Sequence, residues 1–129
     1  MTTEAKTRII TMTDRAPLRI VEADWPLIAS AKDWDNQHEF QANRTWNLRV
    51  RQNRKDGRTI VYGTYTTQFQ NERGAAAGEL LAPPSGSVIS PDESLMWDEI
   101  PAAIKRVASK CGCDKIADEC VADLPAVDL

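Results

Sequence analysis

The chain has 129 residues, of which 42% are apolar and 27% are charged, with a formal net charge of −3. This length fits one domain, residues 1–129, and the composition argues against wholesale disorder. No run approaches the ~18 apolar residues of a membrane span, and no N-terminal run is suited to a signal peptide. We therefore expect no membrane association, a cytoplasmic location and three cysteines that are reduced thiols.

The N-terminal part of the chain predicts a β-hairpin. Residues 1–6 are polar, and we expect them to be flexible. Two short β-like runs follow, over 7–12 and 18–21, with a turn-rich spacer between them. The two runs are expected to pair as a first hairpin.

The next segment carries signals for a short helix. Asp24 is suited to cap a helix, and Pro26 in the first turn would remove no helical hydrogen bond. Three apolar residues follow at helical spacing: Leu27, Ala31 and Trp34. The pattern predicts a helix over about 25–32 and then a strand over 37–42.

The strongest strand signal lies in residues 45–69. Trp46, Leu48 and Val50 alternate with polar residues, and a period of two places these apolar side chains on one face. Gly57 follows an aspartate between the two β-rich runs, which is typical of a hairpin turn because glycine tolerates positive φ. We predict that this hairpin is the centre of an antiparallel sheet.

The C-terminal part predicts loops and then helices. Residues 70–90 are loop-rich, with a short edge strand over 78–81. A helix is predicted over about 98–111, capped by Asp98 and stopped by Gly112. Its apolar stripe consists of Ile100, Ile104, Val107 and Cys111.

A last helix is predicted from a cap at Asp114 to a stop before Pro125. It would bury Ile116, Cys120 and Leu124. A strand-rich half of the chain precedes a helix-rich half, without βαβ alternation. The predicted class is therefore α+β, an antiparallel sheet around the 45–69 hairpin with one or two C-terminal helices packed on one face.

Charge is distributed unevenly along the chain. Residues 44–58 contain six basic residues and one acidic residue, whereas residues 90–129 contain nine acidic and four basic residues. We expect a dipolar molecule with a basic hairpin and an acidic helical layer.

Basic side chains beside aromatic rings can hold phosphates and stack bases, so the hairpin is a candidate nucleic-acid surface. The candidate binding residues are Arg49, Arg51, Arg54, Lys55, Arg58, Tyr62 and Tyr65. Arg51 and Arg54 are both expected to face solvent. The competing interpretation is that surface strands carry arginine for solubility and to protect sheet edges.

An acidic cluster is a candidate site for a small enzyme. Asp33, Asp35 and Glu39 lie near His38, and paired carboxylates can perform acid–base or magnesium chemistry. A solvated loop explains the same residues. The chain has one histidine, which excludes most hydrolase triads and typical zinc sites.

Three cysteines lie near the junction of the two predicted helices: Cys111, Cys113 and Cys120. Their spacing is not that of a zinc knuckle, and packing on the apolar stripes explains two of them. We predict no metal, no cofactor and no catalytic residues.

The chain resembles a group of short proteins of unknown function from bacterial plasmids, prophages and genomic islands. The resemblance lies in residues 24–29, 44–52, 56–63 and 122–126. It implies an accessory protein of a mobile genetic element, a class in which non-enzymatic binders and inhibitors of host defence, including anti-CRISPR proteins, are common. We therefore expect a non-enzymatic protein that occupies a surface of a host protein or protein–nucleic-acid complex. The alternatives are a nucleic-acid-binding protein that uses the basic hairpin and a small enzyme around residues 33–39.

Overall fold

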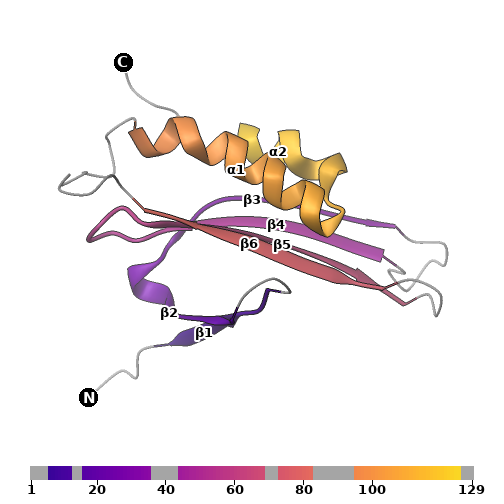
Figure 1. Ribbon diagram of the computed structural model, residues 1–129, viewed down its shortest axis with the longest axis horizontal. Helices are drawn as coiled ribbons and strands as arrows, with labels where there is room; N and C mark the ends of the chain where they lie inside the picture. The colour runs from indigo at the N-terminus through magenta and orange to yellow at the C-terminus, as the bar shows by residue number, and fades with distance from the viewer. Residues whose placement is uncertain (1–5, 13–15, 36–43, 69–72, 83–94, 126–129) are drawn as a thin grey trace.

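The computed structural model describes residues 6–12, 16–35, 44–68, 73–82 and 95–125. Its elements, in chain order, are β1 (Thr7–Ile10), β2 (Leu18–Val21), the 3-10 helix η1 (Glu22–Asp24), β3 (Leu27–Asp35), β4 (Arg44–Gln52), β5 (Thr59–Thr67), β6 (Ala75–Leu81), α1 (Leu95–Cys111), the 3-10 helix η2 (Asp114–Ile116) and α2 (Ala117–Ala122). They form three layers, with a sheet between the two helices and the β1–β2 hairpin (Figure 1). The fold is α+β, as predicted.

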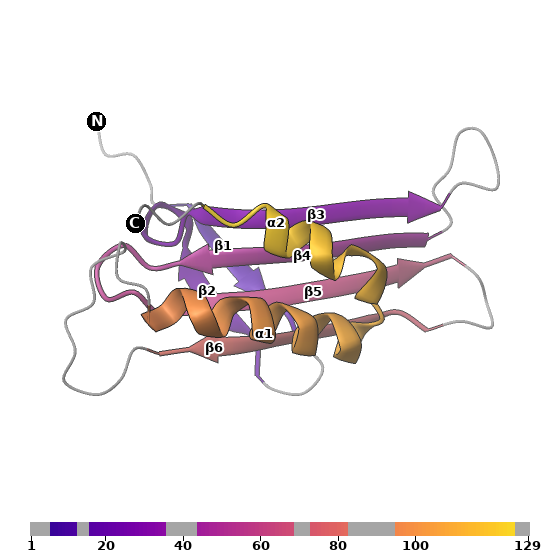
Figure 2. The same cartoon turned by 90° about the horizontal axis from the view of Figure 1, so that it is seen from above.

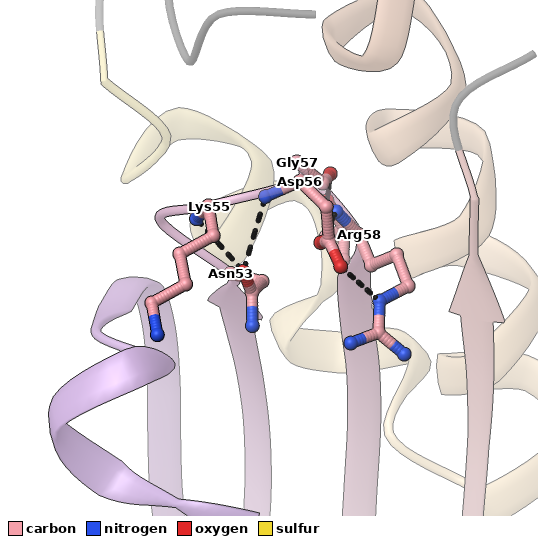
Figure 3. Close-up of polar contacts among 6 residues, drawn as sticks. Asn53, Lys55, Asp56, Gly57 and Arg58 are labelled. Carbon is pink, nitrogen blue, oxygen red and sulfur yellow. Dashed lines mark hydrogen bonds and ion pairs between the residues drawn. The ribbon is translucent and has the colours of Figure 1, made fainter. Parts of the chain in front are cut away.

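The β4–β5 hairpin lies at the centre of a four-stranded antiparallel sheet with the order β3-β4-β5-β6, which confirms the hairpin predicted over 45–69. The Asn53 side chain organises its turn. Oδ1 of Asn53 accepts hydrogen bonds from the backbone N–H groups of Lys55 (2.8 Å) and Asp56 (3.1 Å) (Figure 3). Gly57 has a φ of 77°, so the turn uses the conformational freedom that the sequence predicts.

One face of the sheet carries the main hydrophobic core. Leu48 and Val50 of β4 are fully buried on this face, as their alternation predicts, and Trp46 packs against the same core. α1 crosses over β5 and β6, and α2 lies over β3 and β4 (Figure 2). The apolar stripe of α1, which includes Ile104 and Val107, is buried here and holds the helices to the sheet.

The β1–β2 hairpin packs on the opposite face, as Figure 1 shows, and confirms the predicted first hairpin. It forms a second, smaller core whose buried members are Ile10, Met12, Ile20, Trp25, Ile60 and Tyr62. The buried sheet residues of this core belong to β5, and Leu80 of β6 packs beside them. The hairpin therefore covers the β5–β6 side of this face more than the β3–β4 side.

The predicted helix over about 25–32 is wrong, because this segment enters strand β3. Ala29 and Ala31 are buried and Lys32 is exposed, which fits the period of two of a strand. Pairing with β4 along nearly all of β3 satisfies the backbone groups on its inner edge and outweighs the helical spacing of its apolar residues. Asp24 ends η1 instead of capping a longer helix.

The predicted start of α1 is also wrong. The helix begins at Leu95 rather than at a cap at Asp98. Pro101 consequently lies inside the helix, where it cannot donate a backbone hydrogen bond. Burial of the apolar stripe offsets this loss. The end of the helix is as predicted, since Gly112 has a φ of 75°.

The remaining C-terminal elements agree with the predicted types. The edge strand predicted over 78–81 is the end of β6, which begins earlier, at Ala75. The predicted last helix consists of η2 followed by α2, and Ile116 and Cys120 are buried as expected, whereas Leu124 is half-buried and Asp114 begins η2 instead of capping it. The strand predicted over 37–42 lies outside the described residues. Within the described part of the chain, no helix has the length and apolar character to cross a membrane.

Replacement of Ile104 by aspartate should unfold the protein. Ile104 is fully buried between α1 and the sheet, and an unpaired charge at such a position costs several kcal/mol. We expect the variant to lose the cooperative thermal transition measured by circular dichroism. The matched control is Lys105→Asp, because Lys105 is exposed on the same helix. Equal stability of the two variants would contradict the assignment of this core.

Replacement of Glu79 by glutamine should reduce the stability of the protein at neutral pH but not in strong acid. The Arg106 guanidinium lies 2.8 Å from the Glu79 carboxylate, and this hydrogen bond lowers the pKa of Glu79 below its ordinary value of 4.5. Because the pKa of Glu79 is lower in the folded state than in the unfolded state, its charged carboxylate stabilises the fold at pH values above its ordinary pKa. This stabilisation is lost as the pH falls through the lowered pKa.

Urea denaturation over a pH series measures this effect. At pH 7 we expect Glu79→Gln to lower the free energy of unfolding by less than about 1 kcal/mol, because the pair is partly exposed to solvent. The variant and the parent protein should converge in strong acid, where neither carries a charge at this position. A difference that stays constant with pH would show that the ion pair is not its cause.

Candidate functional site

β4 presents its polar residues on the face of the sheet opposite the helices. Arg49 pairs with Ser30 of β3 and with Tyr62 of β5, and Asn47 pairs with Lys32 of β3. Residues paired across antiparallel strands point to the same face, so these five side chains share one surface. The sheet therefore brings Lys32 to the arginines predicted as binding residues.

A hollow of about 310 Å³ opens on this face between β1 and the β3–β4 pair. Four cationic side chains line it: Arg8, Lys32, Arg49 and Arg51. The other described lining residues are uncharged and include Leu27 and Asn47, so no carboxylate belongs to this described lining. We call this concavity the basic hollow.

A smaller hollow of about 110 Å³ adjoins the basic hollow. Asn47 and Arg49 line both, and Tyr62 and Thr64 of β5 belong to the smaller one. The concave surface therefore runs from β3 across β4 to β5. Its polar groups offer an anionic ligand several hydrogen-bond donors in addition to the cations.

Arg51 is a buried part of this wall, with 8% of its surface exposed, so the expectation that it faces solvent is wrong. Its Nε donates to the Tyr62 hydroxyl (3.0 Å) and its Nη1 donates to the Trp25 carbonyl oxygen (3.1 Å). The β1–β2 layer packs over this part of the face, which the period of two alone cannot indicate. Arg51 thus contributes positive charge from a position that two hydrogen bonds hold in place.

The other three cations of the basic hollow, Arg8, Lys32 and Arg49, differ in whether a carboxylate of the same chain pairs with them. Nε of Arg8 lies 2.6 Å from the Glu22 carboxylate, and this hydrogen bond lowers the pKa of Glu22. By contrast, the side chains of Lys32 and Arg49 make no hydrogen bond or ion pair within the described part of the chain. These two side chains are therefore the ones available to a ligand.

The predicted binding residues at the hairpin tip do not line either hollow. Arg54, Lys55 and Arg58 are exposed at the turn. Nε of Arg58 lies 2.7 Å from the Asp56 carboxylate (Figure 3), and its guanidinium lies over the Trp25 ring. These three residues form a second basic group, of which Arg58 is paired within the chain.

Tyr65 lies on the helix side of the sheet, away from the hollows. Its ring stacks on Trp46 with 5.5 Å between the centroids, and it packs against the main core. The seven predicted binding residues therefore fall into three places. Arg49, Arg51 and Tyr62 are brought together on the open face, whereas the tip residues and Tyr65 are separate.

Two residues of the basic hollow, Arg8 and Lys32, were not among the predicted binding residues. Arg8 comes from a hairpin far away in sequence, and no local pattern could place it beside β4. For Lys32 a signal was available, because Ala29 and Ala31 alternate with polar residues. Because that segment was predicted to be a helix, Lys32 was not expected to lie on the sheet beside Arg49.

The acidic cluster is only partly described. Asp33 lies on the helix side, where its carboxylate is 2.7 Å from Nζ of Lys115, and this hydrogen bond lowers the pKa of Asp33. Lys115 also lies over the Trp46 ring at 3.9 Å. His38 and Glu39 lie outside the described residues. The described part of the cluster is thus an ion pair that joins β3 to η2.

All three thiols are buried, with Cys111 at the end of α1, Cys113 just after it and Cys120 in α2. Sγ of Cys111 and Sγ of Cys113 lie 3.3 Å apart. This hydrogen bond, together with burial, raises the pKa of Cys113, and burial raises the pKa of Cys120 to about 12. Both of these thiols are therefore protonated at neutral pH and pack as small apolar groups. Among the described residues, no three His, Cys, Asp or Glu side chains are grouped so that they could hold a metal ion.

The fold and this surface define an α+β protein with a basic concavity on the open face of its sheet. Comparisons with protein-family models, with curated proteins and with solved structures found no match to the chain.

Charge reversal should have different effects on stability at Arg51 and at Arg54. Arg51→Glu places a carboxylate against the Tyr62 hydroxyl and the Trp25 carbonyl oxygen, so we expect a loss of about 2–4 kcal/mol in the free energy of unfolding. Arg54→Glu changes an exposed side chain and should cost less than about 0.5 kcal/mol. Urea denaturation of both variants measures the difference. Similar costs for the two variants would contradict the buried position of Arg51.

Proposed function

We propose that the protein is a non-enzymatic binding protein that occupies an anionic surface of a partner macromolecule. The observation that carries this proposal is the basic hollow, in which four cationic side chains line one open concavity. Charges of one sign in a concave surface focus the electrostatic field and attract ligands of the opposite sign. Lys32 and Arg49 are the members that carry no internal partner in the described part of the chain.

The charges of the helical layer support a defined orientation toward the partner. Asp114, Asp118, Glu119 and Asp123 are exposed on η2, α2 and the residue that follows α2. Figure 1 shows that these elements lie on the other side of the sheet from the β1–β2 hairpin. With a net charge of −3, the attraction is local to the basic hollow rather than general.

The resemblance to proteins of plasmids, prophages and genomic islands supports a more specific role. In this proposal the protein is an accessory factor of a mobile genetic element and inhibits a host defence complex in the manner of an anti-CRISPR protein. Occupation of a partner surface is sufficient for such inhibition, and no catalytic group is needed. Protein–nucleic-acid complexes carry the anionic surfaces that the basic hollow would recognise.

A capture experiment with matched variants tests this function. The tagged protein is incubated with bacterial lysate, and retained partners are identified by mass spectrometry. We expect a partner that is retained by the parent protein and by Lys105→Glu, which alters the charge of the exposed face of α1. The same partner should be lost with Lys32→Glu, Arg49→Glu, because the hollow then contains two carboxylates. Retention by this double variant, or the absence of any partner, would overturn the proposal.

A further inference from the structure

The open face of the sheet combines features that single out one kind of anionic partner. We propose that the basic hollow binds the phosphodiester backbone of a single-stranded nucleic acid, with a neighbouring base stacked on Trp34. This inference rests on the proposed function, because it names the anionic partner of the same surface. Lys32 and Arg49 contact phosphates, and Arg51 contributes fixed positive charge.

Trp34 supplies a stacking surface next to the cations. It follows Lys32 by two residues on β3, so both side chains point to the open face of the sheet. Its side chain is 55% exposed, although burial of an indole ring is strongly favoured. A rise of roughly 3.3 Å per residue places Trp34 about 13 Å along the strand from Ser30, the partner of Arg49. A phosphate in the basic hollow and a base stacked on the indole can therefore belong to one short stretch of the same nucleic-acid strand.

The hydrogen-bonding groups between these two points suit a nucleotide. Asn47 lies between the basic hollow and the smaller hollow, and Thr64 lines the latter. Thr45 pairs with Trp34 on the same face. Amide and hydroxyl groups both donate and accept hydrogen bonds. They can therefore contact sugars and base edges, which carry donors and acceptors, whereas the carboxylates of an acidic peptide would use only their donors. The combination of cations, an aromatic ring and these groups is typical of single-strand binding.

The shape of the site favours a single strand over a duplex. The basic hollow is recessed between β1 and the sheet, and four of its lining residues belong to β3. A flexible single strand can follow this recess, while the stacked bases of a duplex are unavailable to Trp34. An acidic polypeptide would pair with the cations but carries no base to stack on Trp34.

Fluorescence anisotropy with a labelled oligothymidylate of about 12 nucleotides tests the inference. The two phosphate contacts, made by Lys32 and Arg49, predict that log affinity falls with log salt concentration with a slope of about −1.4. We expect Arg49→Glu to weaken binding about tenfold or more and to reduce this slope by about 0.7 to 1.4, since one contact is lost and one charge is reversed. Trp34→Leu should weaken binding at least about fivefold and leave the slope unchanged, because stacking does not release counterions.

The matched control is Lys105→Glu, which makes the same change of charge as Arg49→Glu but on the exposed face of α1. It should leave the affinity within about twofold, and circular dichroism checks that each variant is folded. The inference would be overturned if Arg49→Glu left the affinity for the oligothymidylate unchanged. It would also be overturned if a duplex that contains the same strand bound as tightly as the single strand.

A second probe separates this inference from the proposed function. If labelled polyglutamate binds and is lost with Arg49→Glu while the oligonucleotide does not bind, the surface recognises anionic proteins and the nucleic-acid inference is wrong. If neither probe binds at low salt, both the inference and the anionic character of the proposed partner are overturned.

Discussion

The register of the β4–β5 ladder determines which side chains meet on each face of the molecule. Because strand side chains alternate with a period of two, one register assigns Leu48 and Val50 to the helix side and Arg49 and Arg51 to the other side. A shift by one residue would bury guanidinium groups among the apolar side chains under α1, which include Ile104 and Val107. The hydrophobic core under the helices and the charged open face therefore follow from the same pairing.

The β1–β2 hairpin gives the open face its shape. It packs on Ile60 and Tyr62 of β5 and leaves the β3–β4 side as a recess beside β1. Arg51 lies where the covered and open parts meet, and its guanidinium is hydrogen-bonded to Tyr62 and to the Trp25 carbonyl oxygen. A buried cation is tolerated when its donors are satisfied in this way. The second core thus positions charge as well as excluding water.

Ion pairs account for many of the charges on the helix side. Arg106 pairs with Glu79 of β6, and Lys115 pairs with Asp33 of β3, so each edge strand is joined to the helical layer. The Asp123 carboxylate accepts a hydrogen bond from the edge N–H of Ser30. These contacts use charge for internal attachment, whereas Lys32 and Arg49 of the basic hollow have no such partner in the described part of the chain. For this reason we propose the open face as the binding surface.

The sequence by itself determined the central hairpin, the buried stripe of α1 and the α+β class, because each depends on a local period or turn. Tertiary structure decided that β3 is a strand, since its pairing with β4 supplies backbone hydrogen bonds that no local pattern reveals. Tertiary structure also decided which residues line the basic hollow. Arg49 was predicted, but Arg8 and Lys32 join it only through contacts between distant segments, and burial of Arg51 depends on a hairpin packed from the far side.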